Sequence, residues 1–215
     1  MIRLSDIYKK GIELLKTAGT EEPERETELL LSYSMDVSLS DIKLFPEREY
    51  EDARAEEFFS LVNERAEGRP LQYVMGQWDF MGYTFYVGEG VLIPRPEIEE
   101  LTENVGKRAA LMDSPVIYDL CSGSGCIGLS LMKMLPKARV FMVEISDEAL
   151  FYLNKNREKM GFGYGASVIK GDVLSGYRSF SSLPEPDIIV SNPPYSTKWV
   201  GEDDVTLIND DRFSP

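Results

Sequence analysis

The sequence predicts an α/β protein in which a small helical bundle and a β-hairpin precede a parallel, doubly wound sheet. Residues 1–67 place apolar side chains at helical spacing and show no strand pattern. Residues 72–93 are rich in aromatic and β-branched side chains around a turn glycine, Gly82. From Val116 onward short apolar strands alternate with helices, and this alternation is typical of a parallel sheet.

The composition of the 215-residue chain narrows the possible functions. The chain has 23 Lys and Arg against 37 Asp and Glu, a net charge of −14, which argues against nonspecific nucleic-acid binding because that binding needs basic side chains. Histidine is absent, which excludes His-dependent nucleophiles and His-based metal sites, so we expect no bound metal. The two cysteines, Cys121 and Cys126, exclude a disulfide scaffold and favour the cytoplasm. No apolar run approaches the roughly 18 residues of a membrane span.

Residues 1–67 form the first expected domain, a helical bundle. Its first helix carries an apolar stripe made of Leu4, Ile7, Tyr8, Ile12 and Leu15. Gly19 is expected to end this helix, and Pro23 stands where the second can begin. A short apolar turn follows Ser40, and residues 51–66 repeat the helical pattern. Helices with one apolar face bury it by packing on one another.

Residues 68–96 are expected to link two domains as a β-hairpin. Gly68-Arg69-Pro70 ends the helical pattern, and Gly82 marks a tight turn between two strands. Pro94-Arg95-Pro96 then breaks regular structure before the last domain, residues 97–215. In that domain we expect strands at 116–120, 139–145, 166–173 and 187–192, and helices at 97–111, 127–135 and 147–160.

The strongest local motif is Asp119-Leu-Cys-Ser-Gly-Ser-Gly-Cys-Ile-Gly128, which follows a predicted strand and opens a predicted helix. Its glycines let the backbone approach a ligand closely, and the helix N-terminus offers unpaired N–H groups. Taken alone, Gly123, Gly125 and Gly128 fit a dinucleotide-binding pattern, and an ordinary α/β turn also fits.

Acidic residues stand at the ends of three successive predicted strands, and they favour one kind of ligand. Asp119 precedes the glycines, Glu144 closes the next strand, and Asp172 ends the third. Glu144 is placed to accept hydrogen bonds from ribose hydroxyls, and Asp172 lies where an adenine is expected. Three acids suit a cationic nucleoside such as S-adenosylmethionine (SAM). Surface acids without a ligand role remain the alternative.

The fourth predicted strand ends in Asn192-Pro193-Pro194-Tyr195, at the edge of the sheet where ligands bind in open α/β folds. The two prolines fix the backbone, so the carbonyl of Pro193 has a set direction. A planar NH₂ group could donate to the Asn192 side-chain oxygen and to this carbonyl, while Tyr195 stacks on it. This arrangement fits methylation of an amide or amine nitrogen. A rigid turn after a core strand is the alternative.

Three motifs together resemble the HemK/PrmC family of amino-methyltransferases. They are Gly68-Arg-Pro-Leu-Gln-Tyr-Val-Met-Gly76, Gly90-Val-Leu-Ile-Pro-Arg-Pro-Glu-Ile-Glu-Glu-Leu101 and Asn192-Pro-Pro-Tyr195. The resemblance covers about residues 1–195. It implies a Rossmann-like, SAM-dependent methyltransferase domain preceded by a helical substrate-recognition domain. It also implies that the substrate is the side-chain amide of the glutamine in the Gly-Gly-Gln motif of class 1 peptide chain release factors.

The same resemblance assigns roles to individual residues. For SAM binding, the residues expected from the strand-end acids and from the resemblance are Asp119, Cys121, Ser122, Gly123, Ser124, Gly125, Glu144, Asp172, Val173 and Asn192. Val173 is expected to flank the adenine. The residues expected to bind the glutamine are Asn192, Pro193, Pro194 and Tyr195, of which Asn192, Pro193 and Tyr195 are expected to act in catalysis.

Two features depart from the family pattern. Ile98 stands where the family has threonine. Residues 196–215 resemble the corresponding segment of type I restriction-modification methylase subunits, whereas family members continue with further strands, so we expect a C-terminally truncated methyltransferase domain. An N6-adenine DNA methyltransferase, which shares the Asn-Pro-Pro-Tyr motif, and an inactive SAM-binding fragment stay open as alternatives. An NAD oxidoreductase would leave that motif unexplained.

Overall fold

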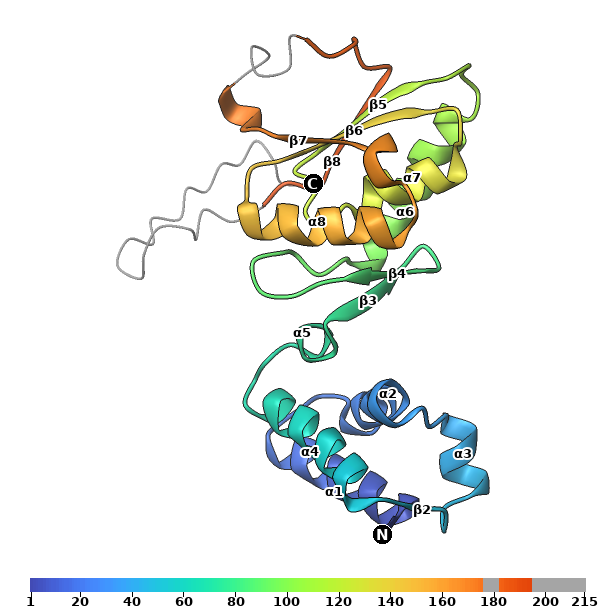
Figure 1. The fold of residues 1–215 in the computed structure, drawn as a ribbon, viewed down its shortest axis with the longest axis vertical. Coiled ribbons are helices and arrows are strands. Elements are labelled where there is room, and N and C mark those ends of the chain that lie inside the picture. The colour runs from blue at the N-terminus through green and yellow to red at the C-terminus, as the bar shows by residue number, and fades with distance from the viewer. Residues whose placement is uncertain (176–181, 195–215) are drawn as a thin grey trace, which may run out of the picture.

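The computed structural model describes residues 1–175 and 182–194. Figure 1 shows a group of helices near the N-terminus, a hairpin above it, and a sheet with its helices beyond the hairpin. The first group consists of β1 (Ile2–Arg3), α1 (Leu4–Thr17), α2 (Pro23–Met35), α3 (Leu39–Leu44), β2 (Glu49–Tyr50) and α4 (Asp52–Ala66). Among the described residues, no helix is both long enough and apolar enough to cross a membrane.

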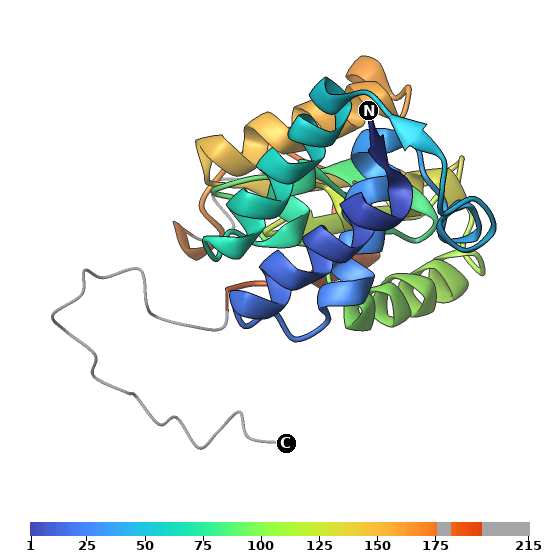
Figure 2. The same cartoon turned by 90° about the horizontal axis from the view of Figure 1, so that it is seen from below.

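The N-terminal helices pack around one apolar core, as their spacing predicted, and Figure 2 views them from below. Its fully buried side chains include Leu4, Ile7, Leu15, Leu30, Leu31 and Phe58. Gly11 in α1 allows the close approach of α2 and α4, because a Cβ there would lie 2.9 Å from both Thr27 and Phe58. Pro23 is the first residue of α2, as expected, since its missing N–H has no intrahelical partner there.

The bundle differs from the prediction at two places. The expectation of no strand is wrong: Ile2 pairs with Tyr50 and Arg3 with Glu49 in a short antiparallel ladder. A two-residue strand is too short to show alternation. In addition, α3 begins at Leu39 rather than after Ser40. The true N-cap is Ser38, whose hydroxyl accepts from the Asp41 N–H.

The hairpin consists of β3 (Gln77–Phe80) and β4 (Tyr83–Tyr86). Met81 and Gly82 form its two-residue turn with φ of 52° and 73°, the backbone of a type I′ turn, and this confirms the predicted turn glycine. The segment just before it was predicted as extended, but it forms the short helix α5 (Leu71–Met75). This helix buries Leu71 and Val74, and Gly76 ends it with φ of 66°.

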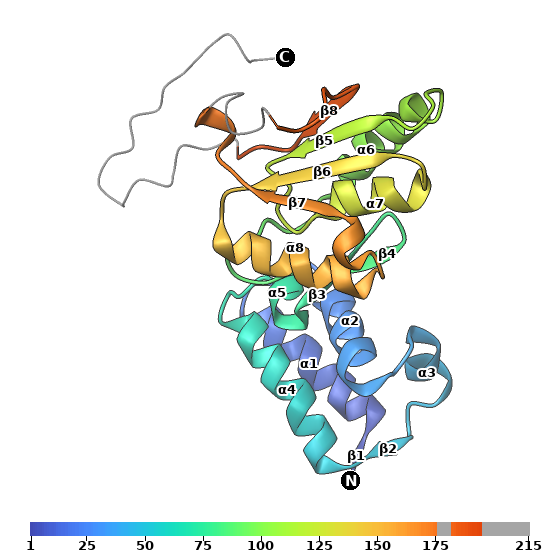
Figure 3. The same cartoon turned by 45° about the horizontal axis from the view of Figure 1, so that its top comes forward.

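The sheet is parallel and has the strand order β7-β6-β5-β8, which Figure 3 shows. Its elements are α6 (Pro96–Ala109), β5 (Val116–Leu120), α7 (Cys126–Met134), β6 (Arg139–Glu144), α8 (Asp147–Lys159), η1 (Gly163–Gly165), β7 (Ser167–Lys170), η2 (Val173–Ser175) and β8 (Ile188–Ser191). The predicted alternation of strand and helix is confirmed. Successive strands extend the sheet from β5 in one direction and then β8 joins on the other side. The order in which strands are added therefore reverses at the boundary between β5 and β8, which is the topological switch point of the sheet.

The two faces of the sheet are covered differently. On one face the main core cluster joins sheet residues such as Ile117 and Met142 to residues of α6, α7, α8 and the hairpin. The other face carries the smaller cluster of Tyr118, Phe141 and Val143. Within residues 1–175 and 182–194, the helices α6, α7 and α8 all belong to the first face. A doubly wound sheet has helices on both faces, and the described part of the chain contains the helices of one of them.

Candidate functional site

The parallel register brings the predicted site residues to one edge of the sheet. Leu120 at the end of β5 pairs with Val143 on one side and with Ser191 on the other. Glu144 at the end of β6 pairs with Lys170 at the end of β7. The glycine loop, Glu144, residues 171–173 and Asn192 therefore all follow strand ends at the same edge, where α/β folds bind ligands.

The glycine loop, residues 121–125, is a tight turn with alternating left-handed residues. The φ angles are 58° at Cys121, 56° at Gly123 and 79° at Gly125. Between them Ser122 is anchored, because its N–H donates to the Val143 carbonyl at 3.0 Å and its hydroxyl to the Asp119 carbonyl at 2.7 Å. Cys121 is strained, since a side chain rarely adopts a positive φ.

Gly128 allows helix α7 to start directly against the sheet. A Cβ at this position would lie 2.5 Å from the Met142 side chain in β6 and 2.9 Å from Asp119 Oδ2. No larger residue fits without moving the helix. The third glycine of the motif thus serves helix–sheet packing, as in dinucleotide-binding folds.

Glu144 lies beside the loop, and its carboxylate is already bonded to backbone. Its Oε2 accepts from the Gly123 N–H at 2.8 Å, and its Oε1 accepts from the N–H groups of Ile145 and Ser146 at 2.8 and 2.9 Å. A carboxylate offers about four acceptor positions. Three are used in these bonds, so Oε2 retains room for one further donor, which fits the expected ribose hydroxyl.

Asp119 is fully buried beneath the loop rather than exposed at its surface. Its Oδ2 accepts from the Gly128 N–H at 2.9 Å. Burial raises the pKa of Asp119 to about 7, and the nearby Glu144 charge adds to this, whereas the hydrogen bonds from Gly128 and Ser122 lower it. Asp119 Oδ1 and the hydroxyl of Ser124 are buried without a hydrogen-bond partner. Two such polar atoms below the loop fit a site that receives a polar ligand group.

Residues beyond β6 and β7 supply apolar surface to the same edge. Asp172 lies two residues after β7 rather than at its end, and its carboxylate accepts from the Leu174 N–H at 2.8 Å, which starts the turn η2. Val173 packs against the cluster of Tyr118, Phe141 and Val143. Ile145, directly after Glu144, is 58% exposed. Ile145 was not among the residues predicted for the site, although an apolar residue next to a strand-end acid is a usable signal.

The end of β8 lies next to the glycine loop across β5. The Ser191 hydroxyl donates to the Leu120 carbonyl at 2.8 Å and ties the two strand ends together. Asn192 follows and is half-buried, while Pro193 and Pro194 are exposed. Tyr195 and the segment 196–215 lie outside the described residues.

The thiols near the loop are not prepared for nucleophilic chemistry. Burial raises the pKa of Cys126 to about 12 and also raises the pKa of Cys121, next to the Glu144 charge. The described part of the chain contains no group of His, Cys, Asp and Glu that could hold a metal ion.

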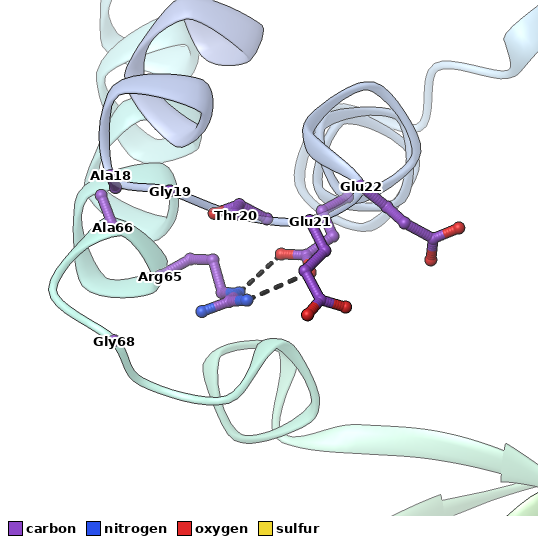
Figure 4. Close-up of a pocket in the computed structure, with 9 residues that line it drawn as sticks. Ala18, Gly19, Thr20, Glu21, Glu22, Arg65, Ala66 and Gly68 are labelled. Carbon is purple, nitrogen blue, oxygen red and sulfur yellow. Dashed lines mark hydrogen bonds and ion pairs between the residues drawn. The ribbon is translucent and has the colours of Figure 1, made fainter.

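A separate hollow of about 300 Å³ lies in the N-terminal bundle, and Figure 4 shows its lining. It lies between the turn that joins α1 to α2 and the end of α4. Arg65 crosses it and pairs with Glu26, its Nη2 lying 3.1 Å from Oε1. This hollow contains none of the predicted site residues.

Two families of known proteins match this chain. The family model "PrmC N-terminal domain" matches residues 6–76, and "Methyltransferase small domain" matches residues 100–208. The release factor glutamine methyltransferase of Chlorobaculum tepidum is 37% identical, with 86% of this chain and 67% of the relative covered. That of Moorella thermoacetica is 36% identical, with 86% of this chain and 64% of the relative covered. That of Clostridium acetobutylicum is 32% identical, with 98% of this chain and 72% of the relative covered. The chain thus spans about two thirds of the length of these relatives.

Solved structures resemble the chain over about half its length. A SAM-dependent methyltransferase from Agrobacterium tumefaciens matches with a TM-score of 0.45 and 22% identity, covering 55% of this chain and 40% of that one. A precorrin-6y C5,15-methyltransferase from Geobacter metallireducens matches with a TM-score of 0.40 and 19% identity, covering 50% and 53%.

The buried carboxyl of Asp119 predicts a pH-dependent stability. With a pKa of about 7 in the folded chain against an ordinary 3.8, the folded state holds one more proton between about pH 4 and 7. Stability should therefore fall as the pH rises through this window, by at most about 1.4 kcal/mol per pH unit. Asp119→Asn should remove this slope. Urea unfolding at pH 5 and pH 7 measures it, with Asp113→Asn, an exposed carboxyl, as the control. An unchanged slope in Asp119→Asn would contradict the assignment.

Proposed function

Because this chain belongs to the family of release factor glutamine methyltransferases, we propose that it transfers a methyl group from SAM to a glutamine side-chain amide in a peptide chain release factor. The single observation that carries the proposal is the convergence of the glycine loop, Glu144 and Asn192 at one edge of the sheet. We further propose class 1 release factors and their Gly-Gly-Gln glutamine as the substrate. Release factors act on ribosomes, so the proposed compartment is the cytoplasm.

SAM is proposed to bind across the glycine loop, and when bound it supplies an electrophilic sulfonium methyl group. The free acceptor position on Glu144 Oε2 takes a ribose hydroxyl. The carboxylate of Glu144 offsets the positive charge in a setting with little water. Ile145 and Val173 offer apolar contact to the adenine ring. Gly123 borders open space, since among the described residues a Cβ there would meet only Val91, at 3.8 Å.

Asn192 and Pro193 are proposed to hold the glutamine amide. Its two N–H groups donate to the Asn192 side-chain oxygen and the Pro193 carbonyl, and this turns the nitrogen lone pair toward the methyl group. As the nitrogen bonds to the methyl carbon, the bond between that carbon and the sulfonium sulfur breaks and S-adenosylhomocysteine is the leaving group. The nitrogen loses one proton to water, so position and electrostatics promote the transfer and no strong base is needed. Pro194 stiffens the turn, and Tyr195, outside the described residues, is proposed to stack on the amide.

The N-terminal helical domain, residues 1–67, is proposed to recognise the release factor. Its core is separate from the core of the sheet domain. Its composition is acidic, and this disfavours DNA as the substrate. The hairpin that follows connects this domain to the sheet domain, in whose core Phe80 and Phe85 lie.

One incubation with methyl-labelled SAM tests the proposed reaction. An intact release factor should take up label, whereas a release factor whose Gly-Gly-Gln glutamine is changed to alanine should not. Duplex DNA is offered in parallel. Label in DNA, or equal label in both release factors, would contradict the proposed substrate.

Glu144→Ala should weaken SAM binding by on the order of 1–3 kcal/mol, or roughly ten- to a hundredfold in Kd. The change removes an ionised acceptor and also releases the Gly123 N–H that shapes the loop. Calorimetry with SAM measures the effect. Asp147→Asn is the matched control, because Asp147 starts the next helix, is exposed and pairs with Lys170. An unchanged Kd in Glu144→Ala would remove Glu144 from the site.

Asn192→Ala should lower the rate of methyl transfer by roughly a hundredfold, or about 3 kcal/mol, because an acceptor that aligns the amide is lost. SAM affinity should persist, since the loop and Glu144 lie on other strands. Single-turnover labelling gives the rate, and calorimetry gives the affinity. A wild-type rate, or a parallel loss of SAM binding, would contradict the proposed role.

A further inference from the structure

Asn156, in helix α8, holds two distant backbone segments with one fully buried side chain. Its Oδ1 accepts from the Tyr86 N–H at 2.6 Å, and its Nδ2 donates to the Tyr86 carbonyl at 3.0 Å. The same Nδ2 donates to the Ser124 carbonyl at 2.9 Å. The amide therefore pairs with β4 as a neighbouring strand would and also fixes the glycine loop.

Other contacts seat the hairpin along α8 around this amide. The ammonium groups of Lys155 and Lys159 lie 4.0 and 4.4 Å from the centre of the Tyr86 ring. Beyond β4, Gly88 passes so close to Tyr152 that a Cβ would lie 1.9 Å from its hydroxyl oxygen. The absence of a side chain at Gly88 therefore allows the segment after the hairpin to pack directly against Tyr152 of α8.

The hairpin also contacts the N-terminal bundle. Trp78 in β3 packs against the core of the bundle and against the small cluster of Val87, Val91 and Ala149. Val91 in turn lies 3.8 Å from where a Gly123 Cβ would stand, and its carbonyl accepts from the Tyr73 hydroxyl at 2.6 Å. Packed contacts thus run from the bundle through the hairpin to the loop.

We propose that Asn156 is a positioning residue that couples the hairpin, and through it the N-terminal bundle, to the glycine loop. A loop ordered by SAM fixes the Ser124 carbonyl, which fixes the Asn156 amide and with it the backbone of Tyr86. Coupling of this kind is reciprocal, so an ordered hairpin also favours SAM binding. The inference rests on the proposed function for SAM as the ligand of the loop.

Hydrogen–deuterium exchange with SAM as the probe tests the coupling. In the unaltered chain SAM should slow exchange across residues 77–86, although none of them is proposed to touch SAM. In Asn156→Ala this SAM-induced protection should disappear, and SAM should bind roughly tenfold more weakly. A residue that only stabilises the fold would raise exchange equally with and without SAM. Asn154→Ala is the matched control, because within the described ranges the side chain of Asn154, in the same helix, bonds only its own helix, at the Leu150 carbonyl.

A second readout uses tryptophan fluorescence. The chain has two tryptophans, so Trp199→Phe leaves Trp78 as the single reporter between hairpin and bundle. SAM should change the Trp78 emission in this background and should not when Asn156→Ala is added.

Several results would overturn the coupling. One is SAM-induced protection of residues 77–86 that persists in Asn156→Ala. Another is the absence of this protection in the unaltered chain, a result that does not depend on whether the variant folds. Labelling separates this inference from the proposed function. If SAM protects the hairpin through Asn156 but no release factor takes up label, the coupling stands and the proposed substrate fails. If the chain binds no SAM, both fail.

Discussion

The geometry of the candidate site depends on two acidic side chains that accept backbone N–H groups, Glu144 from the glycine loop and Asp119 from helix α7. Turning the chain back within five residues directs backbone donors inward, and each unsatisfied donor would cost about 1–3 kcal/mol. Glu144 accepts from Gly123, and Asp119 accepts from Gly128. These bonds tie the loop to β6 and helix α7 to β5. Glu144 therefore shapes the loop and also gives the site negative charge, so neither property can be changed alone.

Much of the fold follows from local sequence rules. The turn at Gly82 needs positive φ at two residues, and the strands of the sheet are apolar runs bounded by turn residues, so both were predictable. Helix α5 was not predicted, because its five residues directly precede the hairpin and are too few to show a helical period. The helix buries Leu71 and Val74 in the core of the N-terminal bundle. Contacts between residues that are distant in the sequence support this element, and a local pattern does not reveal them.

The candidate site likewise contains some features that the sequence reveals and others that it does not. Strand-end acids and glycines are visible in the sequence because parallel strands bring their carboxyl ends together. Asn156 was not visible, because its partners Tyr86 and Ser124 lie 70 and 32 positions away and nothing local marks it. The burial of Asp119 beneath the loop was also hidden, since strand position fixes the edge but not the direction of a side chain.

The strand order explains how one edge can hold two partners. The residues proposed to bind SAM follow β5, β6 and β7, on one side of the point where the order of the strands reverses, and Asn192 follows β8 on the other side. Loops diverge from such a point and leave a crevice between them. The proposed nucleoside on the β6 side and the proposed amide on the β8 side would then meet above the end of β5. The Ser191 hydroxyl, bonded to the Leu120 carbonyl, holds the two sides at a fixed separation. In-line transfer needs this fixed separation, because reacting atoms about 3–3.5 Å apart tolerate little displacement.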